Sequence, residues 1–336
     1  MAKKPLRVLM VIPAPKKNNV SMVFARRHID SLEQMNGLIV YRLFLESRTS
    51  FLSLIKSLRT FFKVQSEFKP DVVHCHYGSM TAFFSAIAAK APLVITFRGS
   101  DLNPVSGNGR LHIFVSHLLS QLASLRARYV ICVSEQLKSR LWWPCVRSRT
   151  IIIPTPVDLE IFKIMDKKKA RELLGWMQED NVILFNNGNG SSNKRLDLAK
   201  EAVKIAKKYI GNKVRFVVLD GNIPPEKIPI LMNGADCLLV TSDYEGSPNV
   251  VKEAMACNLP VVSVNVGDVL ERLHDVYPSR IVDRDPLALG KAIVDILNQK
   301  CRSNGRIIAE HDISTGIINK KTVNVYLKSI NRTGDL

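Results

Sequence analysis

The sequence predicts an α/β protein with two Rossmann-like, doubly wound domains that face a central cleft. Short apolar runs rich in β-branched residues alternate with helical patterns along the chain, which is typical of parallel α/β units. The length of 336 residues exceeds one ordinary core, because a domain typically holds about 150 residues. The alternation also stops at a charged run, residues 166–169, and begins again at Asn181. Two domains with a ligand cleft between them follow from this organisation.

Each predicted strand is an apolar run of four to eight residues flanked by polar sequence. We expect strands at 7–12, 38–45, 71–76, 92–97 and 129–134 in the first half, and at 181–186, 214–219, 236–241, 260–264 and 279–283 in the second. Apolar residues at roughly helical spacing follow Ile313, with no further strand, and predict a closing helix at about 314–330. The predicted domains are 1–165, with the closing helix packing back on it, and 166–313.

Composition limits the class of protein. The hydrophobic content of 46% is that of a well-packed soluble chain, and no run approaches the roughly 18 apolar residues of a transmembrane helix. The apolar stretch 8–14 is too short for an export signal and is interpreted as the first strand. The six cysteines form no CxxC pair, and we expect them to be reduced and buried. These features predict a cytoplasmic protein, peripheral on the inner face of the plasma membrane if it docks there.

The positive charge is uneven along the chain. Residues 1–160 carry 22 Lys and Arg against 9 Asp and Glu, and residues 161–336 carry 26 against 21, within a net charge of +18. This field favours anionic partners such as a membrane surface or a phosphorylated substrate, although a basic proteome background explains it equally well. No nucleic-acid motif accompanies the charge, so we expect no nucleic-acid partner. Residues 51–68 combine apolar and basic side chains as an interfacial helix would, but a core helix is the favoured interpretation.

The most specific segment is DYEGSPNVVKEAMACNLPVVS, residues 243–263. It follows a predicted strand and enters a helix, with Ser247 expected as N-cap and Pro248 as the first helical residue. Free amides at Asn249 and Val250 and the helix dipole suit a diphosphate. Glu245 lies before the helix and Glu253 one turn inside it. A helix N-cap with two solvated glutamates is the alternative to a binding site.

This segment resembles the signature of the retaining, family-4 type of GT-B glycosyltransferases, in which two glutamates are separated by seven residues. The resemblance implies that Glu253 binds the ribose hydroxyls of the donor nucleotide and that Glu245 touches the donor sugar. It also implies that the loop between them, with Gly246 and Ser247, holds phosphate and sugar. The family's usual glycine is replaced by Asn258.

A second segment, NVILFNNGNGSSNKRLDLAKEAVKIAKK, reads as a strand, a Gly-rich loop and a helix. As a dinucleotide fingerprint it is weak, because Gly188 and Gly190 are followed by Asn193. The family has a glycine-arginine pair here and then a lysine that neutralises the departing diphosphate. Lys194 matches the lysine, and Gly188 the glycine, whereas Asn189 occupies the arginine position.

Arg195 is then the candidate for the second cation of this segment. Cations in a first helical turn oppose the helix dipole, and an anionic ligand would resolve that conflict.

The first half resembles the family more loosely. DVVHCHYG, ITFRGSDL, ICVSEQLKSRL and IIIPTPVDLEIF correspond to family segments. Arg98 replaces the expected histidine of a His-Gly-x-Asp turn, and it could clamp an anionic group of acceptor or donor. Asn18 and Asn19 replace a Gly-Gly pair, and asparagine tolerates positive φ at modest cost. The resemblance extends from about residue 7 to residue 330.

The resemblance implies a hexosyltransferase that uses a nucleoside-diphosphate sugar, UDP- or GDP-linked, as co-substrate and no separate cofactor. The acceptor would be a glycan or a lipid-linked group in cell-surface polysaccharide or glycolipid synthesis. Lys194, Arg195 and the helix amides could stabilise the leaving diphosphate, so we expect no metal. The apparent Asp283-Arg284-Asp285 metal motif is better explained by Asp285 as the N-cap before Pro286.

Three alternatives remain at this stage. They are a salt-sensitive nucleic-acid module, another GT-B enzyme such as an epimerase or phosphorylase, and a degenerate, noncatalytic GT-B subunit. Arg98 and Asn189 make the last of these credible.

Overall fold

The computed structural model describes residues 4–13, 22–45, 51–103, 109–188, 190–211 and 213–331. The chain divides into two compact units, one formed by Met1–Thr155 with Thr315–Leu336 and the other by Pro156–Ser314. Val157 and Phe162 pack into the hydrophobic core of the second unit, so the chain has already entered that unit before the charged run at 166–169.

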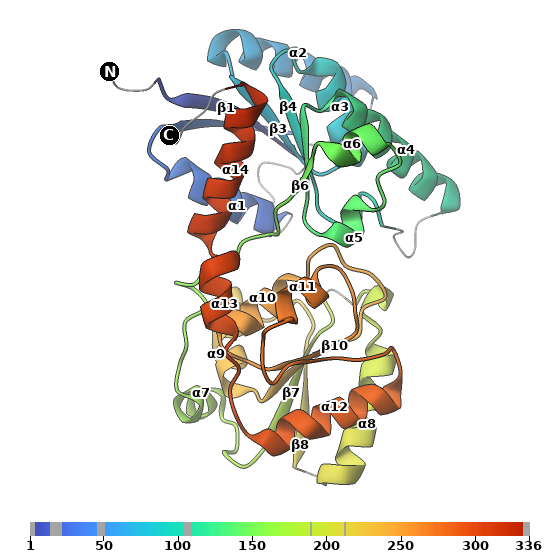
Figure 1. The fold of residues 1–336 in the computed structure, drawn as a ribbon, viewed down its shortest axis with the longest axis vertical. Coiled ribbons are helices and arrows are strands. Elements are labelled where there is room, and N and C mark those ends of the chain that lie inside the picture. The colour runs from blue at the N-terminus through green and yellow to red at the C-terminus, as the bar shows by residue number, and fades with distance from the viewer. Residues whose placement is uncertain are drawn as a thin grey trace. The chain divides into compact units, whose positions relative to one another are not determined.

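The first unit contains a six-stranded, fully parallel sheet in the order β2-β1-β3-β4-β5-β6 (Figure 1). The strands are β1 (Leu6–Ile12), β2 (Leu38–Phe44), β3 (Val72–His76), β4 (Leu93–Phe97), β5 (Tyr129–Cys132) and β6 (Thr150–Ile152). The first five coincide with predicted strands. β6 was not predicted as a separate strand, but it overlaps the start of the strand-like segment IIIPTPVDLEIF, which precedes the predicted break between the domains.

Helices cover both faces of this sheet. They are α1 (Val23–Glu33), α2 (Phe51–Phe68), α3 (Ser79–Ala88), α4 (Arg110–Arg126), α5 (Glu135–Lys138), α6 (Pro144–Ser148) and α14 (Thr315–Ser329). Strand β1 shows why both faces must be covered: Leu9 and Val11 belong to one buried cluster, and Val8, Met10 and Ile12 to another. Alternate residues of a strand point to opposite faces, so an uninterrupted apolar run needs two layers of helices.

The last helix, α14, lies with the first unit although it follows the second in sequence. Ile318, Val323 and Tyr326 are buried in the same cluster as Val8 and Met10. Helix α1 packs beside it on this face (Figure 1).

The second unit contains a five-stranded parallel sheet in the order β11-β10-β9-β7-β8. Its strands are β7 (Asn181–Asn186), β8 (Val214–Leu219), β9 (Cys237–Val240), β10 (Val261–Ser263) and β11 (Arg280–Ile281), and all five were predicted. The helices are α7 (Lys167–Leu174), α8 (Leu196–Ile210), α9 (Ile228–Gly234), α10 (Asn249–Ala256), α11 (Val269–Leu273), α12 (Pro286–Gln299) and α13 (Gly305–Asp312). Two 3-10 turns, η1 (Ser192–Lys194) and η2 (Pro225–Lys227), precede α8 and α9.

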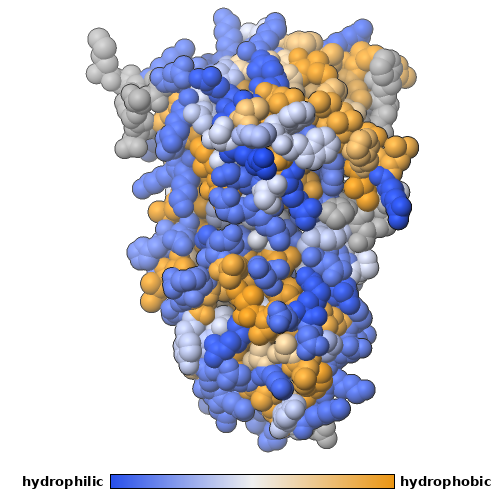
Figure 2. Space-filling view, turned by 45° about the vertical axis from the view of Figure 1, so that its right-hand side comes forward, coloured by the Kyte–Doolittle hydropathy of each residue, from blue (hydrophilic) through white to orange (hydrophobic). Residues whose placement is uncertain are grey.

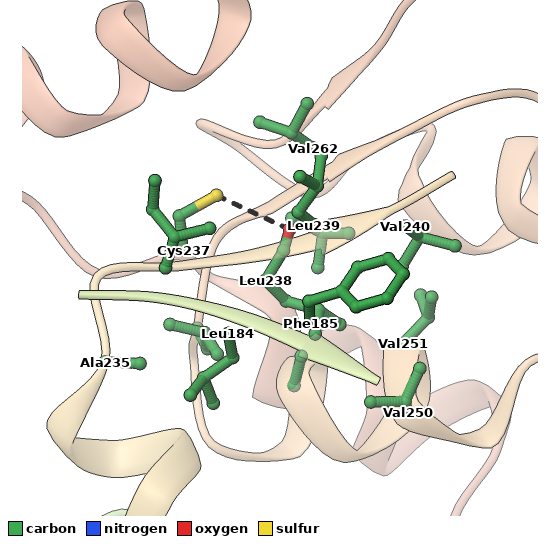
Figure 3. Close-up of a cluster of buried hydrophobic side chains, with 14 of the residues drawn as sticks. Leu184, Phe185, Ala235, Cys237, Leu238, Leu239, Val240, Val250, Val251 and Val262 are labelled. Carbon is green, nitrogen blue, oxygen red and sulfur yellow. Dashed lines mark hydrogen bonds between the residues drawn. The ribbon is translucent and has the colours of Figure 1, made fainter. Parts of the chain in front are cut away.

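Strands β7 and β9 and helix α10 contribute to the core of the second unit, together with α8, β10 and α12. Figure 3 shows Leu184 and Phe185 of β7 packed among the apolar side chains of β9 and against Val250 and Val251. This packing fixes the start of α10 relative to the ends of both strands.

In each sheet the order in which successive strands are added reverses once. The chain moves from β7 outward to β8, then returns to the other side of β7 to form β9, and β1, β2 and β3 repeat this pattern. Ligands of open parallel sheets bind at the carboxyl ends of the strands beside this switch point, because the flanking loops diverge there. The pairs β7/β9 and β1/β3 therefore mark where functional side chains are expected.

Two predictions about the whole chain can be compared with this fold. Of the cysteines, Cys145 and Cys301 are exposed, so the prediction that all six are buried is wrong, because these two lie outside the apolar strand runs. Within the described part of the chain, none of the helices combines the length and hydropathy that crossing a bilayer requires.

Candidate active site

Two loops meet at the switch point of the second unit. One joins β7 to α8 and carries Gly188, Lys194 and Arg195, and the other joins β9 to α10 and carries Glu245, Gly246 and Ser247. Because β7 and β9 are neighbours in register, their loops leave the sheet side by side. The two motifs singled out in the sequence are thus brought to one place.

Asn193 holds the two loops together. Its side-chain amide donates to the carbonyl oxygen of Tyr244 at 2.8 Å, and its Oδ1 accepts from the Tyr244 amide at 3.1 Å. Its own carbonyl accepts from the amide of Asp243 at 2.9 Å. These three hydrogen bonds through a buried asparagine fix the distance between the two loops.

The hydrogen bonds of Asn193 to the other loop place Lys194 beside Glu245. Lys194 Nζ lies 2.5 Å from Glu245 Oε1, and both side chains are largely buried, with 19% and 16% exposed. The same Oε1 accepts from Ser242 Oγ at 2.8 Å. Because Lys194 is largely shielded from water, its attraction to an anion such as a diphosphate is stronger than that of an exposed lysine.

Helix α10 begins at Asn249, with Pro248 at the cap position and no side-chain cap hydrogen bond. The prediction of Ser247 as N-cap is therefore wrong. Ser247 Oγ donates instead to Asp268 Oδ2 at 2.8 Å and accepts from Lys252 Nζ at 2.7 Å. The helix start is left without a side-chain acceptor, which preserves its capacity to bind an anion.

A buried network lies behind the loop. Lys252 and Asp268 are 1% and 3% exposed and meet at the Ser247 hydroxyl, and Arg272 Nε lies 3.5 Å from Asp268 Oδ2. Burial raises the pKa of Asp268, while Lys252 and the Ser247 hydrogen bond oppose this rise. Removing one member would leave another buried and unpaired, so the network fixes the loop that carries Glu245.

Two glycines shape the loops. Gly188 has φ +54°, and a Cβ at this position would lie 4.0 Å from Lys194 Cε. Gly267 has φ +62°, and its Cβ would meet the Gly246 carbonyl oxygen at 3.0 Å and Glu245 Cβ at 3.2 Å. Gly267 packs against the Glu245 loop, and a Cβ there would be crowded and would have to adopt a left-handed conformation.

Arg195 takes a left-handed conformation, φ 56°, and binds two carboxylates. Its guanidinium lies 2.9 Å from Asp197 Oδ2 and 3.2 Å from Asp243 Oδ1. Asp197 lies in the first turn of α8 and offsets the unfavourable cation there. The structure thus engages Arg195 with acidic side chains of its own unit, whereas Lys194 faces Glu245. Asn189, the other candidate of this loop, lies outside the described residues, as do Asn18 and Asn19.

Glu253 is half-buried on α10, four residues after Asn249 and so on the same helical face. Val250 is buried beside it, and the Oδ1 atom of Asn249 is buried without a hydrogen-bond partner in the described part of the chain. An unpartnered acceptor at this helix start is consistent with a site that a ligand completes.

Arg98 belongs to the first unit, at the carboxyl end of β4. The turn after it is held by Asp101, whose carboxylate accepts the backbone amides of Arg98, Gly99 and Gly78. Burial raises the pKa of Asp101, and these three amides oppose the rise. Asp101 therefore fixes the backbone of the turn that follows β4.

The Arg98 guanidinium faces a group of buried histidines. It lies 2.9 Å from His76 Nδ1, its Nε has no hydrogen-bond partner among the described residues, and burial lowers its pKa to about 10. His74 lies beside His76 and contacts Tyr326 Oη at 2.6 Å and Thr96 Oγ1 at 2.7 Å. Burial and the nearby Arg98 charge lower the pKa of His28 to about 3 and the pKa values of His74 and His76 well below 6.5.

The Asp283-Arg284-Asp285 segment has the structural role predicted for it. Asp285 is the N-cap of α12, and its Oδ2 accepts from the Ala288 amide at 2.8 Å. Within the described ranges, no group of three or more His, Cys, Asp or Glu side chains is arranged to hold a metal ion.

Sequence analysis did not assign roles to Asn193, Lys252, Asp268 or Gly267. Lys252 gave no distinct signal in the sequence, because Glu253 follows it directly and a Lys-Glu pair is typical of a solvated helix face. Asn193 and Gly267 act through contacts with residues 51 and 22 positions away, Tyr244 and Glu245, and no local pattern reports such contacts.

Family models identify the two halves of the chain. Residues 15–161 match the model described as Glycosyltransferase Family 4, and residues 177–299 match Glycosyl transferases group 1. The capsular polysaccharide biosynthesis glycosyltransferase CapM of Staphylococcus aureus is 21% identical over 93% of this chain and 90% of its own. The chain spans 62% to 66% of the length of three other curated relatives.

Solved structures share the fold. The sucrose-phosphate synthase of Thermosynechococcus elongatus has a TM-score of 0.74 at 17% identity, with 96% of this chain and 98% of that chain covered. Anabaena Alr3699/HepE in complex with UDP and glucose has a TM-score of 0.71 at 18% identity, with 96% and 100% covered. At these identities the likeness concerns the fold.

The chain therefore belongs to the family-4 type of GT-B glycosyltransferases, with a Family 4 N-terminal half and a group 1 C-terminal half.

Proposed function

We propose that this protein is a retaining hexosyltransferase. It moves a sugar from a nucleoside-diphosphate donor to a glycan or lipid-linked acceptor in cell-surface polysaccharide or glycolipid synthesis. The single observation that carries the proposal is the Lys194–Glu245 pair, held by Asn193 beside the uncapped start of α10 at the switch point of the second unit. The relation to CapM supports a role in polysaccharide synthesis.

The donor diphosphate is proposed to bind at the start of α10. The amides of Asn249 and Val250 donate to it, and the positive end of the helix dipole favours its charge. Gly246 and Ser247 supply the surface of the loop that faces phosphate and sugar, and Glu253, one turn inside the helix, accepts from the ribose hydroxyls. The HepE structure, which contains UDP and glucose, supports a UDP-linked donor.

Bond cleavage builds negative charge on the oxygen that remains with the diphosphate. Lys194 is the cation suited to stabilise that charge, since a preorganised donor in a partly buried site needs little reorganisation as the charge develops. Glu245 holds Lys194 before the donor binds and is then free to contact the sugar. In the first unit we propose that Arg98 binds an anionic group of acceptor or donor. No separate cofactor and no metal are invoked.

Calorimetric titration of UDP, GDP and ADP tests the proposal. Lys194→Ala is expected to weaken binding of the preferred nucleotide about tenfold to a hundredfold, since hydrogen bonds to charged groups contribute about 1.5–3 kcal/mol. Lys200→Ala, an exposed lysine of α8, is the matched control. Repeating the titration with EDTA shows whether a metal contributes.

Binding of no nucleotide would favour a noncatalytic subunit. Release of UDP from a UDP-sugar without acceptor, or epimerised sugar, would favour another GT-B enzyme. With an accepted substrate, the anomeric configuration of the product, read by proton NMR, tests retention.

A further inference from the structure

Helix α4 of the first unit has its apolar side outward. Its buried residues are Ser120, Gln121, Ala123 and Ser124, whereas Leu111, Phe114, Val115, Leu122 and Leu125 are exposed, Leu111 by 75% and Phe114 by 56%. The exposed residues are spaced by three, four or seven positions, which correspond to one or two helical turns, so they form one stripe along the helix. A surface helix normally shows the opposite arrangement.

The polar inner face has a structural reason. Ser120 Oγ accepts from the Ser79 amide at 2.7 Å, and Gln121 bonds to the Arg140 carbonyl and the Trp142 amide, both at 3.0 Å. These bonds explain the buried serines and glutamine. They leave the outer stripe, which we call the α4 stripe, without a function inside the unit.

Other apolar groups extend the α4 stripe. Ile87 of α3, which packs against α4, is 65% exposed, and Trp142, held to α4 through Gln121, is 47% exposed. Figure 2 shows apolar residues gathered at the upper right of the first unit, where α3 and α4 lie. Contiguous exposed apolar surface marks an interaction site, whereas single exposed residues do not.

A cationic groove adjoins the end of the stripe. It has a volume of about 900 Å³ and is lined by Lys90, Arg126, Arg128 and Arg149 together with Leu125 of the stripe. No carboxylate lines it in the described part of the chain. The groove lies at the amino edge of the sheet, since Arg128 precedes β5 and Arg149 precedes β6.

The three arginines of the groove are held by neutral groups, and Lys90 Nζ lies 5.7 Å from the centroid of the Phe62 ring. Arg126 donates to the Ala89 carbonyl, Arg128 to Asn331 Oδ1, and Arg149 to the carbonyls of Ser124 and Leu125. Arg149 Nε is buried and has no hydrogen-bond partner among the described residues. Among the described residues that line the groove, none carries a carboxylate to compensate its positive charge, and this charge favours an anionic partner.

We propose that the α4 stripe and the cationic groove together dock the protein on an anionic lipid bilayer. The stripe enters the boundary between headgroups and acyl chains, Trp142 lies at the headgroup level, and the groove binds lipid phosphates. Because α4 starts after the carboxyl end of β4 and leads to the amino end of β5, docking lays the sheet along the surface.

Co-sedimentation with vesicles tests this proposal. Wild type is expected to bind vesicles of phosphatidylcholine with phosphatidylglycerol, and to bind phosphatidylcholine alone weakly. The groove variant Lys90→Ser with Arg128→Ser is expected to weaken binding to the anionic vesicles about thirtyfold, since two surface cations are lost. The stripe variant Phe114→Ser with Leu122→Ser should weaken it at least as much.

Matched controls carry the same changes on the second unit. Lys204→Ser with Lys208→Ser removes two exposed charges of α8, and Leu173→Ser with Met177→Ser removes exposed apolar groups, and both should bind vesicles as wild type does. Thermal unfolding and nucleotide affinity confirm that each variant is folded.

If the groove variant and the Lys204→Ser, Lys208→Ser control lost the same share of vesicle binding, the proposal would be overturned, because net charge alone would then explain the binding. A stable dimer that the stripe variant converts to monomer, or RNA that displaces the vesicles, would also overturn it. Vesicle binding needs neither donor nor turnover, so its result is independent of the transferase test.

Discussion

Glu245 is the residue whose chemistry changes most between the two states proposed for the site. Without donor its Oε1 accepts from both Lys194 Nζ and Ser242 Oγ. A diphosphate that binds at α10 competes with this carboxylate for the same lysine. Lys194 can therefore pair either with Glu245 or with the diphosphate. The Lys194–Glu245 ion pair lowers the affinity of the site for an anion.

Replacing Glu245 by Gln separates these roles. We expect Glu245→Gln to bind UDP about threefold more tightly, because Lys194 loses a competing ion pair of modest strength, while turnover falls. Glu253→Gln is the contrasting variant and should bind UDP more weakly. Calorimetry and a transfer assay measure both effects. Weaker UDP binding in Glu245→Gln would show that the carboxylate supports the nucleotide directly.

At the scale of elements, the start of α10 depends on a glycine from another loop. Gly267 has a positive φ, and a Cβ at this position would lie 3.0 Å from the Gly246 carbonyl oxygen and 3.1 Å from Pro248 Cδ. The loop geometry is therefore set jointly by the α10 segment, Gly267 and the Lys252–Ser247–Asp268 network.

The variant Gly267→Ala tests whether the geometry of the Glu245 loop depends on this glycine. A Cβ would lie 3.0 Å from a backbone oxygen and impose a left-handed alanine, so the free energy of unfolding should fall by about 1–3 kcal/mol. UDP affinity should fall as well, since the Glu245 loop must move. Gly316→Ala on α14, where a Cβ meets nothing within 4 Å, is the control. Denaturant titration and calorimetry measure the two effects, and an unchanged UDP affinity would exclude the supporting role.

At the scale of the whole molecule, the buried histidine group joins distant parts of the chain. His28 comes from α1, His74 and His76 from β3, Arg98 follows β4, and Tyr326 comes from α14, 252 positions after His74. All three histidines are at most 6% exposed. Since burial and Arg98 disfavour their charged forms, the first unit folds around neutral imidazoles.

The stability of the first unit is therefore expected to depend on pH. The folded-state pKa of His28, about 3, lies below its ordinary value of 6.5, so its contribution is complete above pH 6.5 and is lost as pH falls. The unfolded chain then binds a proton that the folded chain does not. Below pH 6.5 the unfolding free energy should decrease by up to about 1.4 kcal/mol per pH unit for each such histidine.

His28→Gln should flatten this slope by about one histidine's share, measured by denaturant unfolding at several pH values. His112→Gln, on the exposed surface of α4, should leave the slope unchanged. Burial raises the pKa of Asp101 and acts in the opposite direction, so the comparison with wild type is the informative quantity. An identical slope in His28→Gln would mean that this histidine is accessible to protons in the folded state.

The sequence by itself determined the strand pattern, the two-domain α/β class and the candidate residues Lys194, Glu245 and Glu253. The three candidate residues were identified through the resemblance of their short segments to the family's motifs. The strand pattern is local, because apolar runs of a few residues show without long-range contacts. The N-cap of α12 at Asp285 was predictable for the same reason. Ser247 was misassigned because its hydroxyl binds Asp268 and Lys252, and a buried network outweighs a local capping preference.

Only the tertiary structure decided which of these residues meet and what surrounds them. It brought Lys194 to Glu245 through Asn193, directed Arg195 to Asp197 and Asp243, and placed Arg98 against His76. It also turned the apolar side of α4 outward, where periodicity alone would assign that side to the core. The physical reason is that burial and hydrogen-bond partners are set by residues far away in sequence, whereas local pattern shows only that a helix has an apolar face.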